Sequence, residues 1–202
     1  MVGVLFSFLL VFLLRALFGF QPLWDGAVYG GVAGLIGAMG FLWGIGCFDY
    51  WLAWAKGADI SEEDHSFHGV SNWKQYFRLN TDHKVIGIQY LGMTLFFMLW
   101  GGLMALLIRT ELAAPGQQIA DGETYNGFLS MHATLMIFVF AVPVFGGISN
   151  YVLPIMLGAK DMAFPRLNAL SFWFLPVAGF LFLASMFTGM FGAAWTAYPP
   201  LA

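Results

Sequence analysis

The hydrophobic positions of this chain fall into long runs, and polar residues gather between these runs rather than alternating with them. A bilayer core of about 30 Å is crossed by roughly 20 apolar residues of helix. Five runs of suitable length cover residues 2–20, 27–54, 85–108, 127–153 and 168–197. The pattern predicts an all-α, polytopic membrane helix bundle of about five transmembrane helices.

The first two runs are expected to pack together as a hairpin. Small residues recur in the second run, where they let two helices approach closely in lipid; they are Gly30, Gly31, Ala33, Gly34, Gly37, Ala38 and Gly40. Arg15 interrupts the first run and can extend its side chain to the membrane surface. The first run lacks a basic leader and a cleavage site, so we expect a retained helix rather than a signal peptide.

Two further residues modify this picture locally. Asp49 lies at the end of the second run beside Tyr50, Trp51 and Trp54, which favours a place at the interface over a buried proton carrier. Pro143 lies within the fourth run, and we expect it to kink that helix because proline offers no amide hydrogen.

The long polar stretch, residues 56–84, contains a cluster of acids and histidines. Its members are Glu62, Glu63, Asp64, His65 and His68. These residue types can bind metal, but their spacing fixes no ligand geometry, so a solvated loop is favoured. The residues Trp73–Phe77 have the composition of a short interfacial helix.

Lysine and arginine are distributed unequally between the two sides of the predicted bundle. Five alternating spans put Lys56, Lys74, Arg78, Lys84, Lys160 and Arg166 on one side, and only Arg109, with Arg15 if it reaches that way, on the other. The positive-inside rule therefore predicts that the N-terminus and Asp161 face the inside, and that Glu111 and the C-terminus face the outside.

The composition of the chain is that of a membrane protein. Of the 202 residues, 60% are hydrophobic and only 9% are charged, where soluble domains carry about 25%. The net charge of −3 and the lack of a basic run argue against nucleic acid as a partner and leave the lipid membrane. A single cysteine, Cys47, excludes an intrachain disulfide framework.

One ionisable residue, His132, stands inside the fourth apolar run. Such a residue is costly within a membrane and marks a functional site by default. The residues alone leave two interpretations open with equal weight: a histidine hydrogen-bonded to a neighbouring helix, or a ligand to a metal or haem.

Several strings around His132 carry a resemblance. They are Thr81-Asp82-His83-Lys84, Tyr125-Asn126, His132-Ala133, Met136-Ile137-Phe138, Gly146-Gly147 with Asn150, and the stretch from Gly158 to Ser171. Together they resemble subunit I of haem-copper oxidases of the cytochrome c oxidase type. The resemblance implies that residues 81–202 are the first three helices of the subunit I core. Residues 1–80 would be an extension with two transmembrane helices and an inner polar linker.

The resemblance also implies cofactors and the residues that hold them. It assigns His132 as an axial ligand of the iron of a low-spin haem, of the A type, with Arg109 at the edge of its ring and Tyr125, Met136 and Trp195 around it. Glu111 and Gly116 resemble an outer cation site. Copper and a high-spin haem would be bound by helices that follow later in the family.

Three polar residues near the inner face admit two interpretations. Taken alone, Asn150 and Asp161 would cap helices. The resemblance instead implies that Asp161, Asn150 and Asn168 form the entrance of a proton channel, in which a carboxylate collects protons and amides hold a water chain.

The implied activity is reduction of O₂ to water, coupled to proton pumping, by part of a catalytic subunit that is not active alone. Quinol-oxidising relatives carry polar residues where this chain has Trp100, Met104, Thr124 and Gly127, which favours a cytochrome c-type donor. The expected partners are oxidase subunits II and III, and the expected place is a bacterial inner membrane. The alternatives are a quinol-oxidising relative and a non-enzymatic five-helix membrane protein derived from the oxidase.

Overall fold

The computed structural model describes residues 2–20, 22–23, 32–59, 70, 72–190, 192–193 and 195–196. Within these ranges the regular elements are all helical, which confirms the predicted all-α class. They are α1 (Val2–Leu17), α3 (Gly34–Gly44), α4 (Asp49–Ala55), the 3-10 helix η2 (Trp73–Phe77), α5 (His83–Glu111), α6 (Gly122–Thr134), the π-helix η3 (Leu135–Ala141), α7 (Val142–Leu157) and α8 (Pro165–Thr188).

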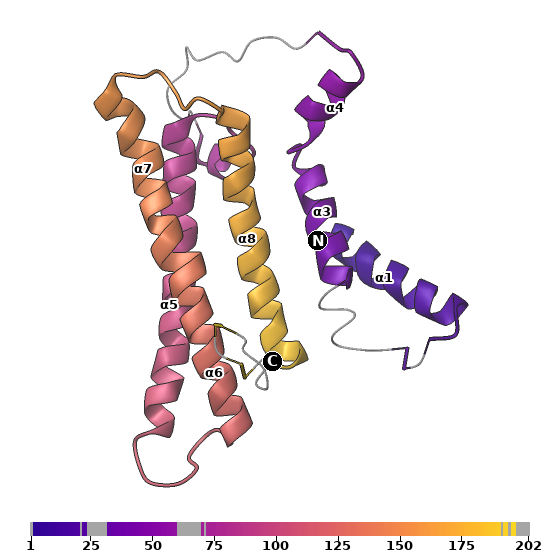
Figure 1. Cartoon of the computed structure of the whole chain (residues 1–202), viewed down its shortest axis with the longest axis vertical. Coiled ribbons are helices and arrows are strands. Elements are labelled where there is room, and N and C mark those ends of the chain that lie inside the picture. The colour runs from indigo at the N-terminus through magenta and orange to yellow at the C-terminus, as the bar shows by residue number, and fades with distance from the viewer. Residues whose placement is uncertain are drawn as a thin grey trace.

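Three helices are long and apolar enough to cross a membrane. They are α5, the continuous helix formed by α6, η3 and α7 over 36 residues, and α8. Figure 1 shows them side by side, with the link from α7 to α8 at the top and the link from α5 to α6 at the bottom. We call these the Asp161 end and the Glu111 end of the bundle. The molecule is an integral membrane protein, as the sequence predicts.

The second predicted span is bent rather than straight. Helices α3 and α4 meet at 77°, so together they give a fourth span only if the bent pair is counted as one. The bend contains Gly46, whose φ of 85° suits glycine, and a Cβ there would lie 2.9 Å from Oδ2 of Asp49. Helix α1 has 16 residues, fewer than a bilayer core requires. It packs on α3, with Val11 buried against Ala33 at the N-cap of α3, so the first two apolar runs are in contact; a hairpin of two complete spans stays a prediction.

Pro143 does not end its helix. The seven residues Leu135–Ala141 adopt π-helical winding just before it, and α7 then continues with the proline in its first turn. A proline leaves the carbonyl of the preceding turn without its usual donor, and the wider π winding is one way in which a helix absorbs such a disruption.

Close helix crossings are made at glycines. Gly87 of α5 faces Gly147 of α7 so closely that a Cβ on Gly87 would lie 2.9 Å from the carbonyl oxygen of Gly147. Where α8 meets α5, the buried ring of Phe97 occupies the space beside Gly179. Small residues at such crossings let membrane helices pack by direct van der Waals contact. These two crossings hold α5, α7 and α8 together and fix the register of their polar side chains.

Candidate functional site

His132 of α6 is oriented by the neighbouring helix. Its Nδ1 lies 2.8 Å from the carbonyl oxygen of Gly101 in α5. A carbonyl oxygen only accepts, so Nδ1 carries the proton and donates, which leaves the lone pair on Nε2. Within the part of the chain that the structure describes, Nε2 makes no hydrogen bond. The half-buried ring can therefore offer Nε2 to a metal.

Two neighbours keep this arrangement in place. Met136, one turn after His132, packs against Gly101, where a Cβ would lie 2.7 Å from the Met136 sulfur. The π-helix η3 begins three residues after His132 and widens the helix at this level. Single π turns occur frequently at functional sites.

The other residues expected around the cofactor lie at different places. Arg109 is exposed in the last turn of α5, and Tyr125 is half-buried in the first turn of α6. Trp195 follows α8, and its ring centroid lies 6.1 Å from that of Phe138 in η3. The structure thus places Met136 against Gly101, the residue whose carbonyl oxygen accepts from His132. Among the described residues it shows no contact between the His132 ring and Arg109, Tyr125 or Trp195.

Polar side chains of three helices gather at the Asp161 end. His83, at the start of α5, is buried and donates from Nδ1 to the carbonyl oxygen of Asn150 at 2.9 Å. In α8, Ser171 donates to the carbonyl oxygen of Asn168 at 2.7 Å and lies 3.0 Å from the hydroxyl of Tyr90. The backbone carbonyl of Asn150 is thus bonded directly to α5, and that of Asn168 is linked to Tyr90 of α5 through Ser171.

The helix-capping interpretations of Asn150 and Asp161 are wrong. Asn150 lies inside α7, where its amide donates to the carbonyl oxygen of Gly146, so it is at neither helix end. The N-cap of α8 is Phe164, which provides no side-chain hydrogen bond. Asp161 lies in the link between α7 and α8, half-buried, and accepts from the N–H of Met162. Helix α7 continues for seven residues past Asn150, and α8 begins only at Pro165, so neither residue stands at a helix start.

Unpartnered buried atoms mark the same end. Oδ1 of Asn150 and Nδ2 of Asn168 are buried and make no hydrogen bond with the described residues. A buried polar group without a partner costs about 1–3 kcal/mol, and an ordered water that bonds to it removes this cost. This pair of amides therefore calls for water at the Asp161 end.

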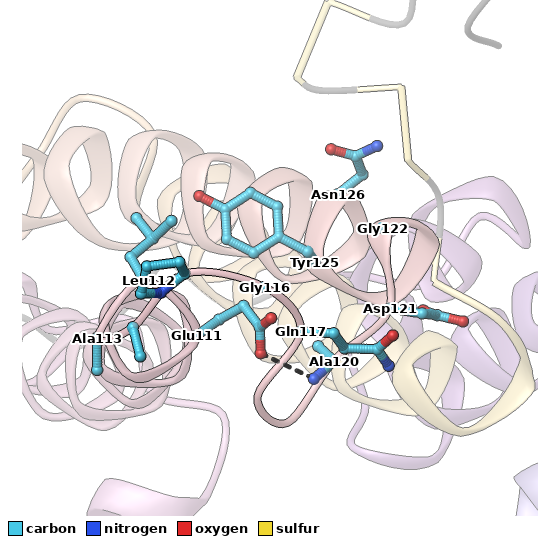
Figure 2. Close-up of a pocket in the computed structure, with 12 residues that line it drawn as sticks. Glu111, Leu112, Ala113, Gly116, Gln117, Ala120, Asp121, Gly122, Tyr125 and Asn126 are labelled. Carbon is cyan, nitrogen blue, oxygen red and sulfur yellow. Dashed lines mark hydrogen bonds between the residues drawn. The ribbon is translucent and has the colours of Figure 1, made fainter.

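At the Glu111 end, a loop folds back around one carboxylate (Figure 2). The Glu111 side chain, 8% exposed, accepts from three backbone N–H groups, those of Gln118, Ile119 and Ala120, at 3.0, 2.7 and 2.9 Å. Gly116 turns the loop with a φ of 86°, and its carbonyl oxygen accepts from the side chain of Gln118. A cation here would share oxygens already bonded by the loop, and the outer cation site stays a prediction.

The same loop starts α6 through Asp121. Its Oδ1 accepts from the N–H of Thr124 as the N-cap of α6. Hydrogen bonds from the side chain and the backbone of Thr124 hold the pKa of Asp121 below its usual value. Glu111, Asp121 and Tyr125 line a common surface hollow, so the expected site residues Glu111, Gly116 and Tyr125 do come together.

Among the described residues, no group of three or more His, Cys, Asp or Glu side chains could hold a metal ion. The acid and histidine cluster from Glu62 to His68 lies outside the described residues.

Fold and site together define a class: a polytopic α-helical membrane protein with polar groups at both ends of its bundle and one oriented histidine between two long helices. The comparison with known proteins is more specific, because residues 85–202 match the family described as cytochrome c and quinol oxidase polypeptide I. The chain belongs to this family, and the resemblance inferred from the sequence is confirmed.

Three similar curated proteins are described as cytochrome c oxidase subunit 1. "Cytochrome c oxidase subunit 1" of Thermostichus vulcanus is 56% identical over 130 residues, which are 64% of this chain and 24% of that protein. The proteins of the same description from Synechocystis and Corynebacterium efficiens are 47% and 45% identical over 66% and 68% of this chain, and over 24% of their own lengths. The chain thus spans about a quarter of the length of the curated relatives it matches.

Three polar residues of the site are not found by sequence reasoning. His83 enters it only as part of a motif, and Gln89 and Tyr90 do not enter it at all. All three lie within about two turns of the start of α5; Gln89 and Tyr90 carry polar groups inside the apolar run 85–108, and His83 lies just before it. Polar residues recurring in such a run are the signal that could have found them.

Proposed function

We propose that this chain is part of the catalytic subunit of a terminal respiratory oxidase, which reduces O₂ to water with electrons from cytochrome c and pumps protons. Membership in the family and the descriptions of three relatives support the proposal. Because the relatives are about four times longer than the matched segment, the activity belongs to a larger assembly with further subunits in a bacterial inner membrane.

The observation that carries the proposal is the orientation of His132. Histidines that bind metal donate their second ring N–H to a backbone carbonyl or carboxylate, which fixes the tautomer and makes the ligating nitrogen more basic. The bond from Nδ1 to the Gly101 carbonyl oxygen provides this, and Nε2 stays available. These residues fit a haem, which supplies an iron that accepts and passes on single electrons.

The resemblance to the family extends the proposal to the other residues expected around the haem. Met136 keeps Gly101 and the ring of His132 in register, and Arg109 provides a cation near the Glu111 end that can stabilise negative charge at the edge of a haem. The other two residues of the proposed set are Tyr125, which lies on α6 as His132 does, and Trp195, which lies on the segment after α8. The haem is of the low-spin A type, and a second haem and copper are bound by other parts of the assembly.

The proton path begins at the Asp161 end. Asp161 is a half-buried acid in an exposed link, suited to collect protons, and the buried amides Asn150 and Asn168 have atoms that water would satisfy. Amides support a water chain without holding a proton, because they do not titrate at physiological pH. Asp161, Asn150 and Asn168 therefore form the entrance.

The test is His132→Ala in the assembled oxidase. We expect loss of the low-spin haem absorption band, because one of two axial ligands is gone, while a high-spin signal persists. His132→Gln is a matched variant that keeps a polar group but cannot ligate as strongly, and it should lose the band as well. An unchanged low-spin spectrum in either variant would overturn the assignment, and purification of the wild-type assembly without any haem would favour the non-enzymatic alternative.

A further inference from the structure

The 3-10 helix η2 has an unusual outer surface. Trp73 and Phe77 are 68% and 71% exposed, and their rings meet edge to face with centroids 5.8 Å apart. Lys74 and Arg78 are exposed beside them. The other side faces the protein, where Tyr76 is half-buried and Leu79 packs on the core of the bundle. The exposed side therefore combines one aromatic pair with two cations.

Gln89 holds η2 against the bundle. Its side chain is 6% exposed, and its Nε2 donates to the carbonyl oxygens of Tyr76 and Arg78, at 2.9 and 3.1 Å. Both amide hydrogens are thus used at the C-terminal end of η2. At the other end, Oδ1 of Asn72 accepts from the N–H of Lys74 at 3.1 Å. The five-residue segment is thus capped at its N-terminal end and attached to α5 at its C-terminal end, which is more than a solvated linker requires.

The attachment point fixes the depth of η2. Gln89 lies six residues after His83, so it is about 9 Å along the helix from the start of α5. The uncharged run of α5, residues 85–108, is about 36 Å long, which exceeds a hydrocarbon core of about 30 Å. Gln89 therefore lies near the boundary of the hydrocarbon, and η2 lies beside it at the level of the lipid headgroups.

Each part of this surface matches one part of a phospholipid. Tryptophan and other aromatic rings settle at the headgroup level with their apolar bodies toward the acyl chains. Lysine and arginine beside a membrane attract anionic lipids. Between residues 72 and 110 the sequence has one acidic residue, Asp82, and its Oδ1 is engaged by the N–H groups of Lys84 and Val85.

We propose that η2 is a binding site for an anionic phospholipid. The phosphate and the acidic headgroup lie against Lys74 and Arg78, the rings of Trp73 and Phe77 insert beside the acyl chains, and Gln89 is the positioning residue that keeps η2 at this depth. The site depends on neither haem nor oxygen chemistry.

The experiment uses the full chain in nanodiscs made of phosphatidylcholine with a small fraction of phosphatidylglycerol. Native mass spectrometry counts each retained lipid as the phosphatidylglycerol fraction rises. We expect the double variant Lys74→Gln with Arg78→Gln to need more phosphatidylglycerol for half-occupancy, by about fivefold for each lost cation, with phosphatidylcholine unchanged. Lys160→Gln, which removes an exposed lysine at the same end of the bundle, should match the wild type.

A second variant separates position from charge. Gln89→Leu keeps both cations but removes the two hydrogen bonds to η2, and we expect it also to retain less phosphatidylglycerol while its helix content is unchanged. Wild-type retention in the double variant would overturn the proposal. An equal loss of phosphatidylglycerol in Lys160→Gln would overturn it as well, because the attraction would then come from the overall positive charge of this end. Equal retention of phosphatidylglycerol and phosphatidylcholine by the wild type would also overturn it.

Discussion

The crossing of α5 and α7 gives a sharp test of the packing. A Cβ on Gly87 would lie 2.9 Å from the carbonyl oxygen of Gly147, and also 2.9 Å from Cβ and 3.1 Å from the backbone nitrogen of Tyr151. Ordinary contacts of this kind are 3.4–4 Å. The obstructing atoms are backbone and Cβ, which cannot rotate away, so Gly87→Ala must move the two helices apart by several tenths of an ångström.

The magnitude follows from two opposing effects. Overpacking by one methyl group costs about 1–3 kcal/mol. Replacement of a helical glycine by alanine returns roughly 0.5–1 kcal/mol, because alanine loses less backbone entropy on folding. A Cβ on Gly92 of the same helix would meet nothing within 4 Å, so Gly92→Ala receives only the favourable effect. The difference between the two variants isolates the clash, and we expect about 1–3 kcal/mol.

The assay is unfolding of the full chain in mixed micelles with increasing dodecyl sulfate, followed by circular dichroism. Gly87→Ala should unfold at a lower fraction of dodecyl sulfate than the wild type, and Gly92→Ala at the same fraction or a higher one. Gly147→Ala meets Cβ of Tyr90 at 2.8 Å and should behave like Gly87→Ala. The double variant Gly87→Ala with Gly147→Ala should lose less stability than the two single variants lose together, because helices that are already separated accommodate a second methyl group. Equal stability of Gly87→Ala and Gly92→Ala would refute the crossing.

Three further predictions rest on other parts of the chain. Asp161→Asn in the assembled oxidase should slow oxygen consumption and proton uptake while the haem spectra stay normal; wild-type rates would remove Asp161 from the proton path. A reporter fused after Ala202 should score outside the cytoplasm, and a cytoplasmic score would reverse the topology. Asp82→Ala should destabilise the chain by about 1 kcal/mol, because Oδ1 of Asp82 caps α5 through the N–H of Lys84, and Asp82→Asn should restore most of that stability.

The sequence predicts the long helices well and the bent one poorly. Residues 85–108 carry no charge, and any other structure would leave their backbone polar groups unpaired in lipid, so α5 follows from the pattern. The second run is equally apolar, but its helix bends at Gly46, where glycine adopts the left-handed conformation. The apolar residues on either side of Gly46 give no sign of this bend in the sequence. A run of apolar residues specifies membrane residence, and it does not show where a helix bends.

Contacts between the helices could not be predicted for a related reason. Most exposed positions of α5 and α8 are apolar because they face lipid, so periodicity does not separate the lipid side from the protein side. The partner of His132 is the carbonyl group of Gly101, and a backbone carbonyl leaves no mark in the sequence. The same holds for the bond from His83 to Asn150. Resemblance to a family pointed to His132, whereas only the fold showed how its ring is held.

His83 and His132 make the same kind of hydrogen bond, yet their capacity to bind a ligand differs. Each ring donates from Nδ1 to a carbonyl oxygen of a neighbouring helix. His83 is 2% exposed and lies between α5 and α7, so its ring joins two helices and has no open side. His132 is half-buried, so its Nε2 can meet a group that approaches from outside the described helices. A hydrogen bond that orients a histidine supports the proposed ligation but is not sufficient for it, and the open side of the ring distinguishes His132.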